Sequence, residues 1–193
     1  DTFQYTVADP QGGETVATAI IEVTGTLPVS QVQLSSGSQS VTLNAVVQEV
    51  LKGSSDADTL TLSGSAVSGD EFDGGAGSDT LVLGDAGNQI TVDNVENIQG
   101  GSGDDRIEIA SPGTGGTSIT TGGGSDTVAL GGDFEFVSAA LSGDDLVVSA
   151  NYTDPDDAAA ETERVSVTIS DQSSAPIQSI EMDLDGDGEV DAN

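Results

Sequence analysis

Aspartate follows closely spaced glycines at several places in this sequence, and that combination can hold a metal ion. In GGAGSD, which begins at Gly74, consecutive glycines permit a positive φ, so the backbone can curl and turn its carbonyl oxygens to one side. The carboxylate of Asp79 adds charged oxygens to the same turn. Two such turns stacked about 4.8 Å apart would enclose a gap lined only by oxygen. Calcium takes roughly six to eight oxygen ligands, so the motif predicts calcium-binding turns.

The motif occurs four times, in complete and incomplete forms. GSSDADTLT begins at Gly53, GGAGSDTLV at Gly74, GGSGDDRIE at Gly100 and TGGGSDTVA at Thr121. The aspartates at the sixth position are separated by 21, 26 and 21 residues, which indicates a 47-residue unit with two turns, present nearly twice. We expect these turns to stack in one column along one edge of the fold. The candidate calcium ligands in the four copies are Gly53, Asp56, Asp58, Gly74, Gly75, Gly77, Asp79, Gly100, Gly101, Gly103, Asp105, Gly122, Gly124 and Asp126.

A different acidic motif lies at the C-terminal end. DLDGDGEVDAN, residues 183–193, matches the D-x-D-x-D-G start of a calcium loop, with glycine at the sixth position. Its candidate ligands are Asp183, Asp185 and Asp187. The alternative for this segment is a solvated acidic tail without a bound ion.

Short β-branched runs must position these turns. They alternate with Gly, Ser and Asp clusters, which is typical of an all-β chain, and a helical 3.6-residue period is absent. Each interval holds a Gly/Asp turn, a strand such as Thr80–Leu83, a second turn and a second strand such as Gln89–Val92. This plan suits one coil of a parallel β-solenoid. The predicted core consists of Leu81, Leu83, Ile90, Val92, Val95, Ile98, Ile107, Ile109, Ile119, Val128 and Leu130.

The charge of the chain narrows the possible partners. There are 34 acidic and three basic residues, for a formal charge of −31, so the basic patch that nucleic acids require is absent. The same charge disfavours anionic membrane surfaces, and no apolar run approaches the roughly 20 residues that span a bilayer. Without Cys or His, zinc–thiolate sites and Ser–His–Asp or Cys–His catalysis are excluded. We therefore predict that the chain is not an enzyme.

The glycine–aspartate motif is similar to the G-G-x-G-x-D-x-hydrophobic-x nonapeptide of repeats-in-toxin (RTX) proteins. The copies at Gly74 and Gly100 match it fully, the copy at Thr121 lacks the first glycine, and the copy at Gly53 lacks two. The resemblance covers roughly residues 45–132. It implies a calcium-loaded parallel β-roll that is exported unfolded, by type I secretion, and folds outside the cell. Family motifs run back to back, whereas extra residues separate them here.

Four segments follow from these patterns. Residues 1–27 contain two alternating strands and resemble the last hairpin of a cadherin-like or Ig-like domain. Residues 28–132 are the predicted solenoid, and residues 133–182, with strands but no Gly–Gly motif, are its predicted β cap. Residues 183–193 are the acidic tail.

The functional prediction is a calcium-binding structural or adhesive module of a secreted bacterial surface protein, such as an adhesin, a surface layer or a filament. Its expected partners are calcium ions and neighbouring copies or domains of the same surface protein. One alternative is the secretion module of an RTX exoenzyme such as a metalloprotease or lipase. Another is that the motifs are only tight turns capped by aspartate. A carbohydrate- or ice-binding face would need a regular threonine ladder, and we expect that the threonines do not form one.

Overall fold

The computed structural model describes residues 2–8, 14–20, 30–43, 47–131, 133–155, 161–172, 174 and 176–182. The first two strands, β1 (Thr2–Ala8) and β2 (Glu14–Ile20), pair with each other in antiparallel fashion as a separate two-stranded sheet. Both strands expected within residues 1–27 are therefore present. The candidate ligands Asp183, Asp185 and Asp187 lie outside the described residues.

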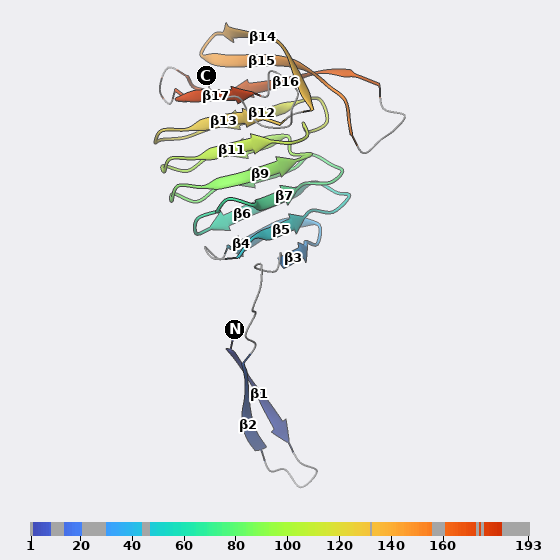
Figure 1. Cartoon of the computed structure of the whole chain (residues 1–193), viewed down its shortest axis with the longest axis vertical. Coiled ribbons are helices and arrows are strands. Elements are labelled where there is room, and N and C mark those ends of the chain that lie inside the picture. Colours follow the sequence, from blue (N-terminus) through green and yellow to red (C-terminus); the bar gives the residue numbers. More distant parts are fainter. Residues whose placement is uncertain are drawn as a thin grey trace.

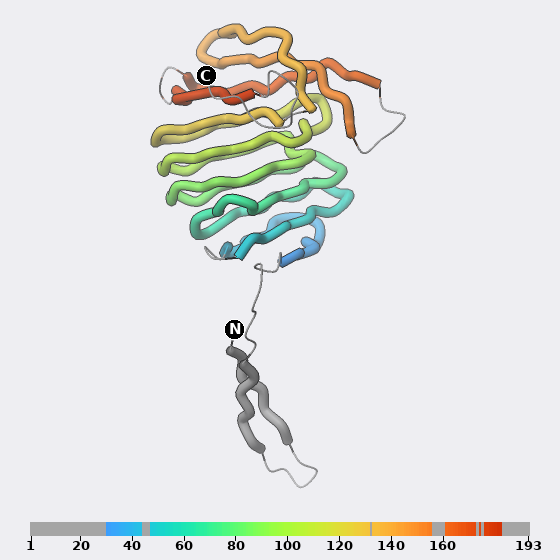
Figure 2. The backbone as a smooth tube through the Cα atoms, viewed as in Figure 1, coloured from blue at the N-terminus to red at the C-terminus, as the bar shows by residue number. Residues whose placement is uncertain are grey.

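The remaining strands form a parallel β-solenoid of about five turns (Figures 1 and 2), which confirms the predicted fold class. From β3 to β14, successive strands alternate between two sheets. The seven-stranded sheet contains β3 (Ser30–Gln33), β5 (Glu49–Lys52), β7 (Asp70–Asp73), β9 (Gln89–Asp93), β11 (Arg106–Ile109), β13 (Thr127–Leu130) and β17 (Ser179–Met182). The eight-stranded sheet contains β4 (Gly37–Thr42), β6 (Asp58–Ser63), β8 (Thr80–Val82), β10 (Asn97–Gln99), β12 (Thr117–Thr120), β14 (Phe134–Ser142), β15 (Asp145–Tyr152) and β16 (Glu163–Ile169).

Turns join the sheets along two opposite edges. We call edge I the turns that lead from the seven-stranded to the eight-stranded sheet, and edge II the turns that lead back. Leu60 pairs with Leu81, Leu81 with Ile98, and Ile98 with Ile119, so successive coils differ in length. The middle coil, at 17 residues, is four residues shorter than its neighbours.

The core lies between the two sheets, where alternate residues of each strand point inward. All eleven residues of the predicted core are buried, and Phe72, Leu60 and Ile169 join them. Because stacked coils place like residues over one another, the interior consists of aligned rows of Leu, Ile and Val. Each such side chain contributes about 1.5–3 kcal/mol on full burial, so this row stacking is the main source of stability.

The chain after β13 first leaves the solenoid plan and then returns to it. β14 and β15 form an antiparallel hairpin, in which the rings of Phe134 and Tyr152 lie 5.0 Å apart. β16 then pairs in parallel with β12, and β17 with β13, so both sheets gain a further coil. The described residues contain no helix, and hence none long and apolar enough to cross a membrane.

The threonines on the described part of the eight-stranded sheet do not form a continuous ladder, since Thr59 and Thr80 are its one threonine–threonine pair, but polar residues of several types are aligned there. Thr59 pairs with Thr80 and Ser40 with Thr61 on the outer side of the eight-stranded sheet, and other hydroxyl and amide residues continue both rows. These rows mix Ser, Thr, Asn and Gln, so the sequence does not show them as a repeat of one residue type.

Candidate functional site

The four glycine–aspartate motifs lie on two edges rather than one. The copies that begin at Gly53 and Gly74 form turns on edge I, whereas those at Gly100 and Thr121 form turns on edge II. The predicted single column is therefore wrong. Edge I holds Gly53, Asp56, Asp58, Gly74, Gly75, Gly77 and Asp79, and edge II holds Gly100, Gly101, Gly103, Asp105, Gly122, Gly124 and Asp126.

The spacing between Asp79 and Asp105 explains the switch of edge. Asp79 is followed one coil later, on the same edge, by Glu96, 17 residues on. Asp105 comes half a coil after Glu96, which places it on the opposite side. The 26 residues from Asp79 to Asp105 are therefore the 17 residues of the short coil, which end at Glu96, and the nine residues that cross from Glu96 to edge II.

On edge I, the sixth-position carboxylates form a continuous hydrogen-bonded column. The Gly37 N–H donates to Asp58 Oδ1 at 2.7 Å, and the Asp58 N–H donates to Asp79 Oδ1 at 2.7 Å. The Asp79 N–H donates in turn to Glu96 Oε2 at 2.6 Å. Each side chain therefore accepts from the backbone of the preceding coil and extends the sheet ladder beyond the strand end. Asp58 and Asp79 are buried, while Glu96 is partly exposed.

Edge II has the same plan with one change of residue type. The Ala66 N–H donates to Asn88 Oδ1 at 3.0 Å, the Asn88 N–H to Asp105 Oδ1 at 3.0 Å, and the Asp105 N–H to Asp126 Oδ1 at 2.9 Å. The Asn88 amide also donates to Asp105 Oδ1 at 2.8 Å. The column on edge II therefore begins with a neutral side chain that supplies an extra donor to the first carboxylate.

The second carboxylate oxygens separate Asp79 from its neighbours. Asp58 Oδ2 accepts from the Ser54 N–H at 2.7 Å, and Asp105 Oδ2 accepts from the Gly101 N–H at 3.2 Å. Asp79 Oδ2 has no hydrogen-bond donor although the side chain is fully buried. In the described part of the chain, the Thr121 hydroxyl is the other buried polar atom without a partner, and it too belongs to a motif turn. Both orphaned oxygens thus lie on the predicted metal-binding turns.

The pKa directions separate Asp58 from the other two carboxylates. Burial raises the pKa of Asp79; the Asp58 N–H lowers it, and the charges of Glu96, Asp58 and Asp73 raise it further. Burial also raises the pKa of Asp105, against hydrogen bonds from Asn88 and Gly101. At Asp58, burial raises the pKa, but hydrogen bonds from Ser54 and Gly37 together outweigh it, so the net pKa is lowered. The ionised forms of Asp79 and Asp105 are therefore both disfavoured, and Asp79 is the one of these three carboxylates with an unpaired oxygen.

Backbone and carboxylate oxygens pack closely against the first glycine of three motifs, where no side chain could fit. A Cβ added at Gly74 would meet Asn94 O and, at 2.8 Å, Asp79 Oδ2. One at Gly53 would meet Gly74 O and Asp58 Oδ2, and one at Gly100 would meet Thr121 O and Asp105 Oδ2. In each case, a carboxylate oxygen and a carbonyl oxygen from the next coil face the same glycine. Paired oxygens of this kind are the ligand type that calcium takes, so the residues fit the ion chemically.

The arrangement differs from a site made of carboxylates alone. Among the described residues, no group of three or more His, Cys, Asp or Glu side chains is placed to hold one metal ion. A bound ion would therefore take most of its ligands from backbone carbonyls. The positive φ values of 86° at Gly75 and 136° at Gly77 show how glycine permits the curled backbone of such a turn. Asp56, by contrast, is exposed.

Two residues of the columns were missed in the sequence. Glu96 takes the place of an aspartate on edge I, and Asn88 takes that place on edge II. Neither follows a Gly–Gly pair, so the motif search passed over them. The signal that could have found them is polar character at the residue before each apolar strand, as in NQITV and ENIQ.

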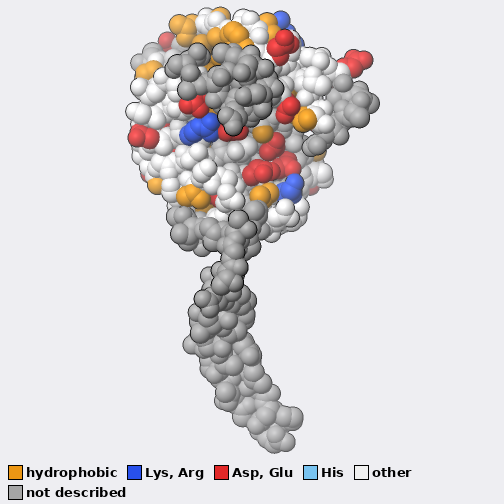
Figure 3. Space-filling model, viewed as in Figure 1, with side chains coloured by type: hydrophobic (Ala, Val, Ile, Leu, Met, Phe, Trp, Pro, Cys, Tyr) orange, Lys and Arg blue, Asp and Glu red, His pale blue; other side chains and the backbone are white. Residues whose placement is uncertain are grey.

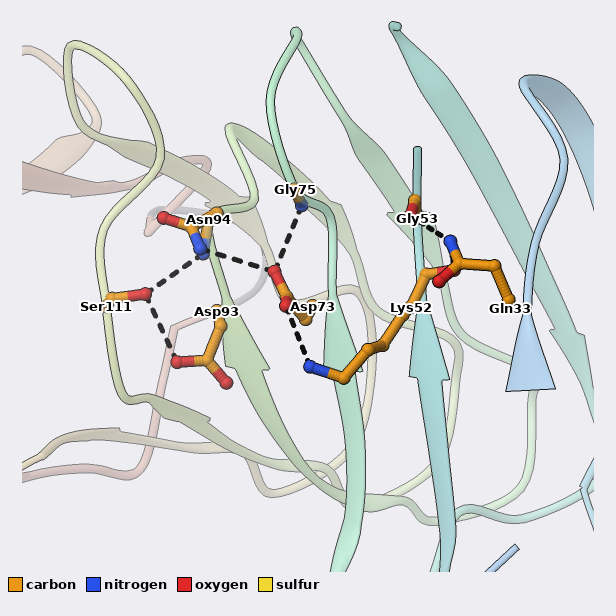
Figure 4. Close-up of polar contacts among 8 residues, drawn as sticks. All are labelled: Gln33, Lys52, Gly53, Asp73, Gly75, Asp93, Asn94 and Ser111. Atoms are coloured by element: carbon orange, nitrogen blue, oxygen red, sulfur yellow. Dashed lines mark hydrogen bonds and ion pairs between the residues drawn. The ribbon is translucent and has the colours of Figure 1, made fainter. Parts of the chain in front are cut away.

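A further acidic cluster lies outside the motifs, on the outer side of the seven-stranded sheet beside edge I (Figure 4). A cavity of about 310 Å³ is lined there by Glu71, Asp73, Asp93, Asp133 and Asp154, with Lys52 and Tyr152. Asp73 accepts from Lys52 at 3.4 Å and from the Asn94 amide at 3.2 Å. Burial raises the pKa of Asp93 to about 6; the Ser111 hydroxyl lowers it, and the charges of Glu71 and Asp73 raise it.

The comparisons with known proteins leave this chain without an assigned relative. No family model matches it, and neither the curated proteins nor the solved structures contain a match. The site must therefore be interpreted from its own geometry.

Proposed function

We propose that this chain is a calcium-stabilised β-solenoid that serves as a stiff structural module of a secreted or cell-surface bacterial protein. The observation that carries the proposal is the buried, donor-free Oδ2 of Asp79, which lies in a column with Asp58 and Glu96. An uncompensated buried carboxylate costs about 1–3 kcal/mol or more, and a cation would offset that cost.

Backbone N–H groups and carbonyl oxygens have separate roles in the proposed site. The ladder of N–H donors holds Asp58, Asp79 and Glu96 in register in the folded chain. Carbonyl oxygens of the next coil, such as Asn94 O, approach the first glycine of three motifs, namely Gly53, Gly74 and Gly100. Calcium, when bound, would supply positive charge and link neighbouring coils through shared oxygen ligands.

The overall charge supports an extracellular setting for this proposal. A chain with a formal charge of −31 repels itself at neutral pH, which destabilises a compact state. Extracellular calcium modules bind at about 10⁻⁴–10⁻³ M, and at 10 to 100 times the dissociation constant each site adds about 1.4–2.7 kcal/mol. Folding would then be coupled to calcium and would occur outside the cell.

The Asp79→Asn variant tests the proposal, because the change that it makes in the melting temperature should have opposite signs in EDTA and in calcium. The amide keeps an oxygen for the Asp58 N–H and removes the buried charge, so in EDTA the variant should unfold at a higher temperature than the wild type. In millimolar calcium it should unfold at a lower temperature, because a ligand is lost. At about 1 kcal/mol, each shift is about 2–4 °C for a chain of this size.

The matched control is Asp144→Asn, in the exposed turn between β14 and β15. It removes one negative charge without touching either column, and its melting temperatures should equal those of the wild type in both buffers. If Asp79→Asn shifts the melting temperature equally with and without calcium, the column is only a capping device and the proposal fails.

A further inference from the structure

The outer side of the eight-stranded sheet carries no charge over five neighbouring strands. Its outward residues alternate with the buried ones and have hydroxyl or amide side chains, apart from one valine. They are Ser38, Ser40 and Thr42 in β4, Thr59, Thr61 and Ser63 in β6, Thr80 and Val82 in β8, Asn97 and Gln99 in β10, and Ser118 and Thr120 in β12. We call this surface the hydroxyl face.

These residues are aligned in two rows across the strands. One row runs through Ser38, Thr59, Thr80, Asn97 and Ser118, and the other through Ser40, Thr61, Val82, Gln99 and Thr120. Parallel strands lie about 4.8 Å apart, and outward residues along a strand are about 6.6 Å apart, so the polar groups form a regular grid. Within the described part of this face, the side chains hydrogen-bond to one another only at Thr42 and Ser63, 2.7 Å apart.

The opposite outer side has a different composition. The outward residues of the seven-stranded sheet include Lys52, Glu71, Asp73, Asp93, Arg106 and Glu108. Figure 3 shows this side, with acidic and basic side chains over it. In a chain with 34 acidic residues, an uncharged face of this extent is a departure from the rest of the surface. Charged groups are absent where hydrogen-bonding groups are most regularly spaced.

We propose that the hydroxyl face binds a neutral, hydroxyl-rich polysaccharide. Hydroxyl and amide groups both donate and accept hydrogen bonds, and so do the hydroxyl groups of a sugar chain. The acidic remainder of the chain repels anionic polymers, so the charge distribution selects an uncharged one. The face has no aromatic platform, so each sugar contributes little and affinity grows with the number of sugars bound at once.

Affinity electrophoresis and pull-down of the full chain in calcium buffer test this inference. The probes are dextran and insoluble cellulose, with polygalacturonate as the anionic comparison. The wild type should be retarded by dextran, more strongly by longer dextran chains, or retained on cellulose. It should not be retarded by polygalacturonate. No retention by either neutral polymer would overturn the proposal.

Two isosteric variants locate the binding. Gln99→Glu introduces one charge on the hydroxyl face, whereas Gln89→Glu introduces one on an exposed position of the other sheet. Gln99→Glu should weaken retention about fivefold, the value of roughly one lost hydrogen bond, and Gln89→Glu should leave it unchanged. Equal losses in both variants, or a self-association of the chain that Gln99→Glu abolishes without any polysaccharide retention, would contradict the assignment.

Discussion

The two edges of the solenoid share one construction but differ in how their charge is compensated. On edge I, three carboxylates follow one another, those of Asp58, Asp79 and Glu96. On edge II, Asn88 precedes Asp105 and donates its amide to the first carboxylate oxygen. The backbone ladder is the same on both edges, so the ladder alone does not require a cation.

If calcium binds as proposed, this difference predicts which edge depends on it more. An amide can compensate a neighbouring carboxylate in the column without an ion, because it supplies a hydrogen-bond donor where a carboxylate supplies only acceptors. The column of edge I has no such residue. The Gly75 N–H, which corresponds to the donors of Asp58 and Asp105 Oδ2, donates to Asp73 instead, so Asp79 Oδ2 is left without a donor. We therefore expect calcium to act first at edge I and less strongly at edge II.

The largest expected effect comes from making edge II resemble edge I. In Asn88→Asp, a buried carboxylate would face Asp105 and the carbonyl oxygens of Gly84 and Ala86, which now accept from the amide at 3.1 and 2.6 Å. Without calcium, the free energy of unfolding should fall by about 3–5 kcal/mol. Calcium should restore much of that loss, as measured by urea unfolding with and without the ion.

The control for that variant is Asn97→Asp on the hydroxyl face, where the side chain is exposed. It should change the free energy of unfolding by less than about 0.5 kcal/mol in either buffer. If calcium fails to rescue Asn88→Asp, the two edges do not differ in the way described.

Two glycine variants, one on each edge, compare the edges further, and the expected change in stability is of intermediate size. In Gly74→Ala, the added methyl group would enter the space between Asn94 O and Asp79 Oδ2, which should cost about 1–3 kcal/mol and abolish the calcium response of edge I. In Gly123→Ala on edge II, the nearest atoms would be 3.7 Å away, so no loss is expected. Thermal unfolding with and without calcium distinguishes them; a full calcium response in Gly74→Ala would show that the oxygens packed against this glycine do not bind the ion.

The smallest effect is a dependence of stability on pH. Burial raises the pKa of Asp93 from 3.8 to about 6, so in this window the folded chain holds more protons than the unfolded chain. Stability without calcium should therefore fall as the pH rises from about 4 to about 6, and the raised pKa values of Asp79 and Asp105 act in the same direction. After allowance for solvent screening, Asp93 contributes about 1 kcal/mol, or about 2–4 °C.

The variant Asp93→Asn should flatten this dependence, whereas Asp144→Asn should leave it unchanged. Melting temperatures measured in EDTA at intervals between pH 4 and pH 7 provide the check. A stability that increases with pH in both variants and in the wild type would contradict the assigned direction.

Much of the fold followed from the sequence because burial patterns are local. Residues such as Leu81 and Ile107 alternate with polar neighbours, and a period of two defines the inward side regardless of coil length. The turns were also visible, since glycine before aspartate marks them. The core and the solenoid class were therefore predicted correctly.

The partition into edges was not predicted, because it depends on coil length. Glu96 replaces the expected glycine–aspartate turn in a coil four residues shorter than its neighbours, and that shift moves Asp105 to the other side. The hydroxyl rows were missed because they mix Ser, Thr, Asn and Gln rather than repeat one residue type. A register is a property of pairing between coils, and one sequence shows only the spacing along the chain.

Calorimetric titration of the EDTA-treated wild-type chain with calcium, beside an identical titration with magnesium, tests the central claim most directly. The account predicts saturable calcium binding at about 10⁻⁴–10⁻³ M, a higher melting temperature at saturation and little response to magnesium. Binding no tighter than about 10⁻² M, with an unchanged melting temperature, would contradict the account. It would show that backbone hydrogen bonds alone stabilise the buried carboxylates of the two edges.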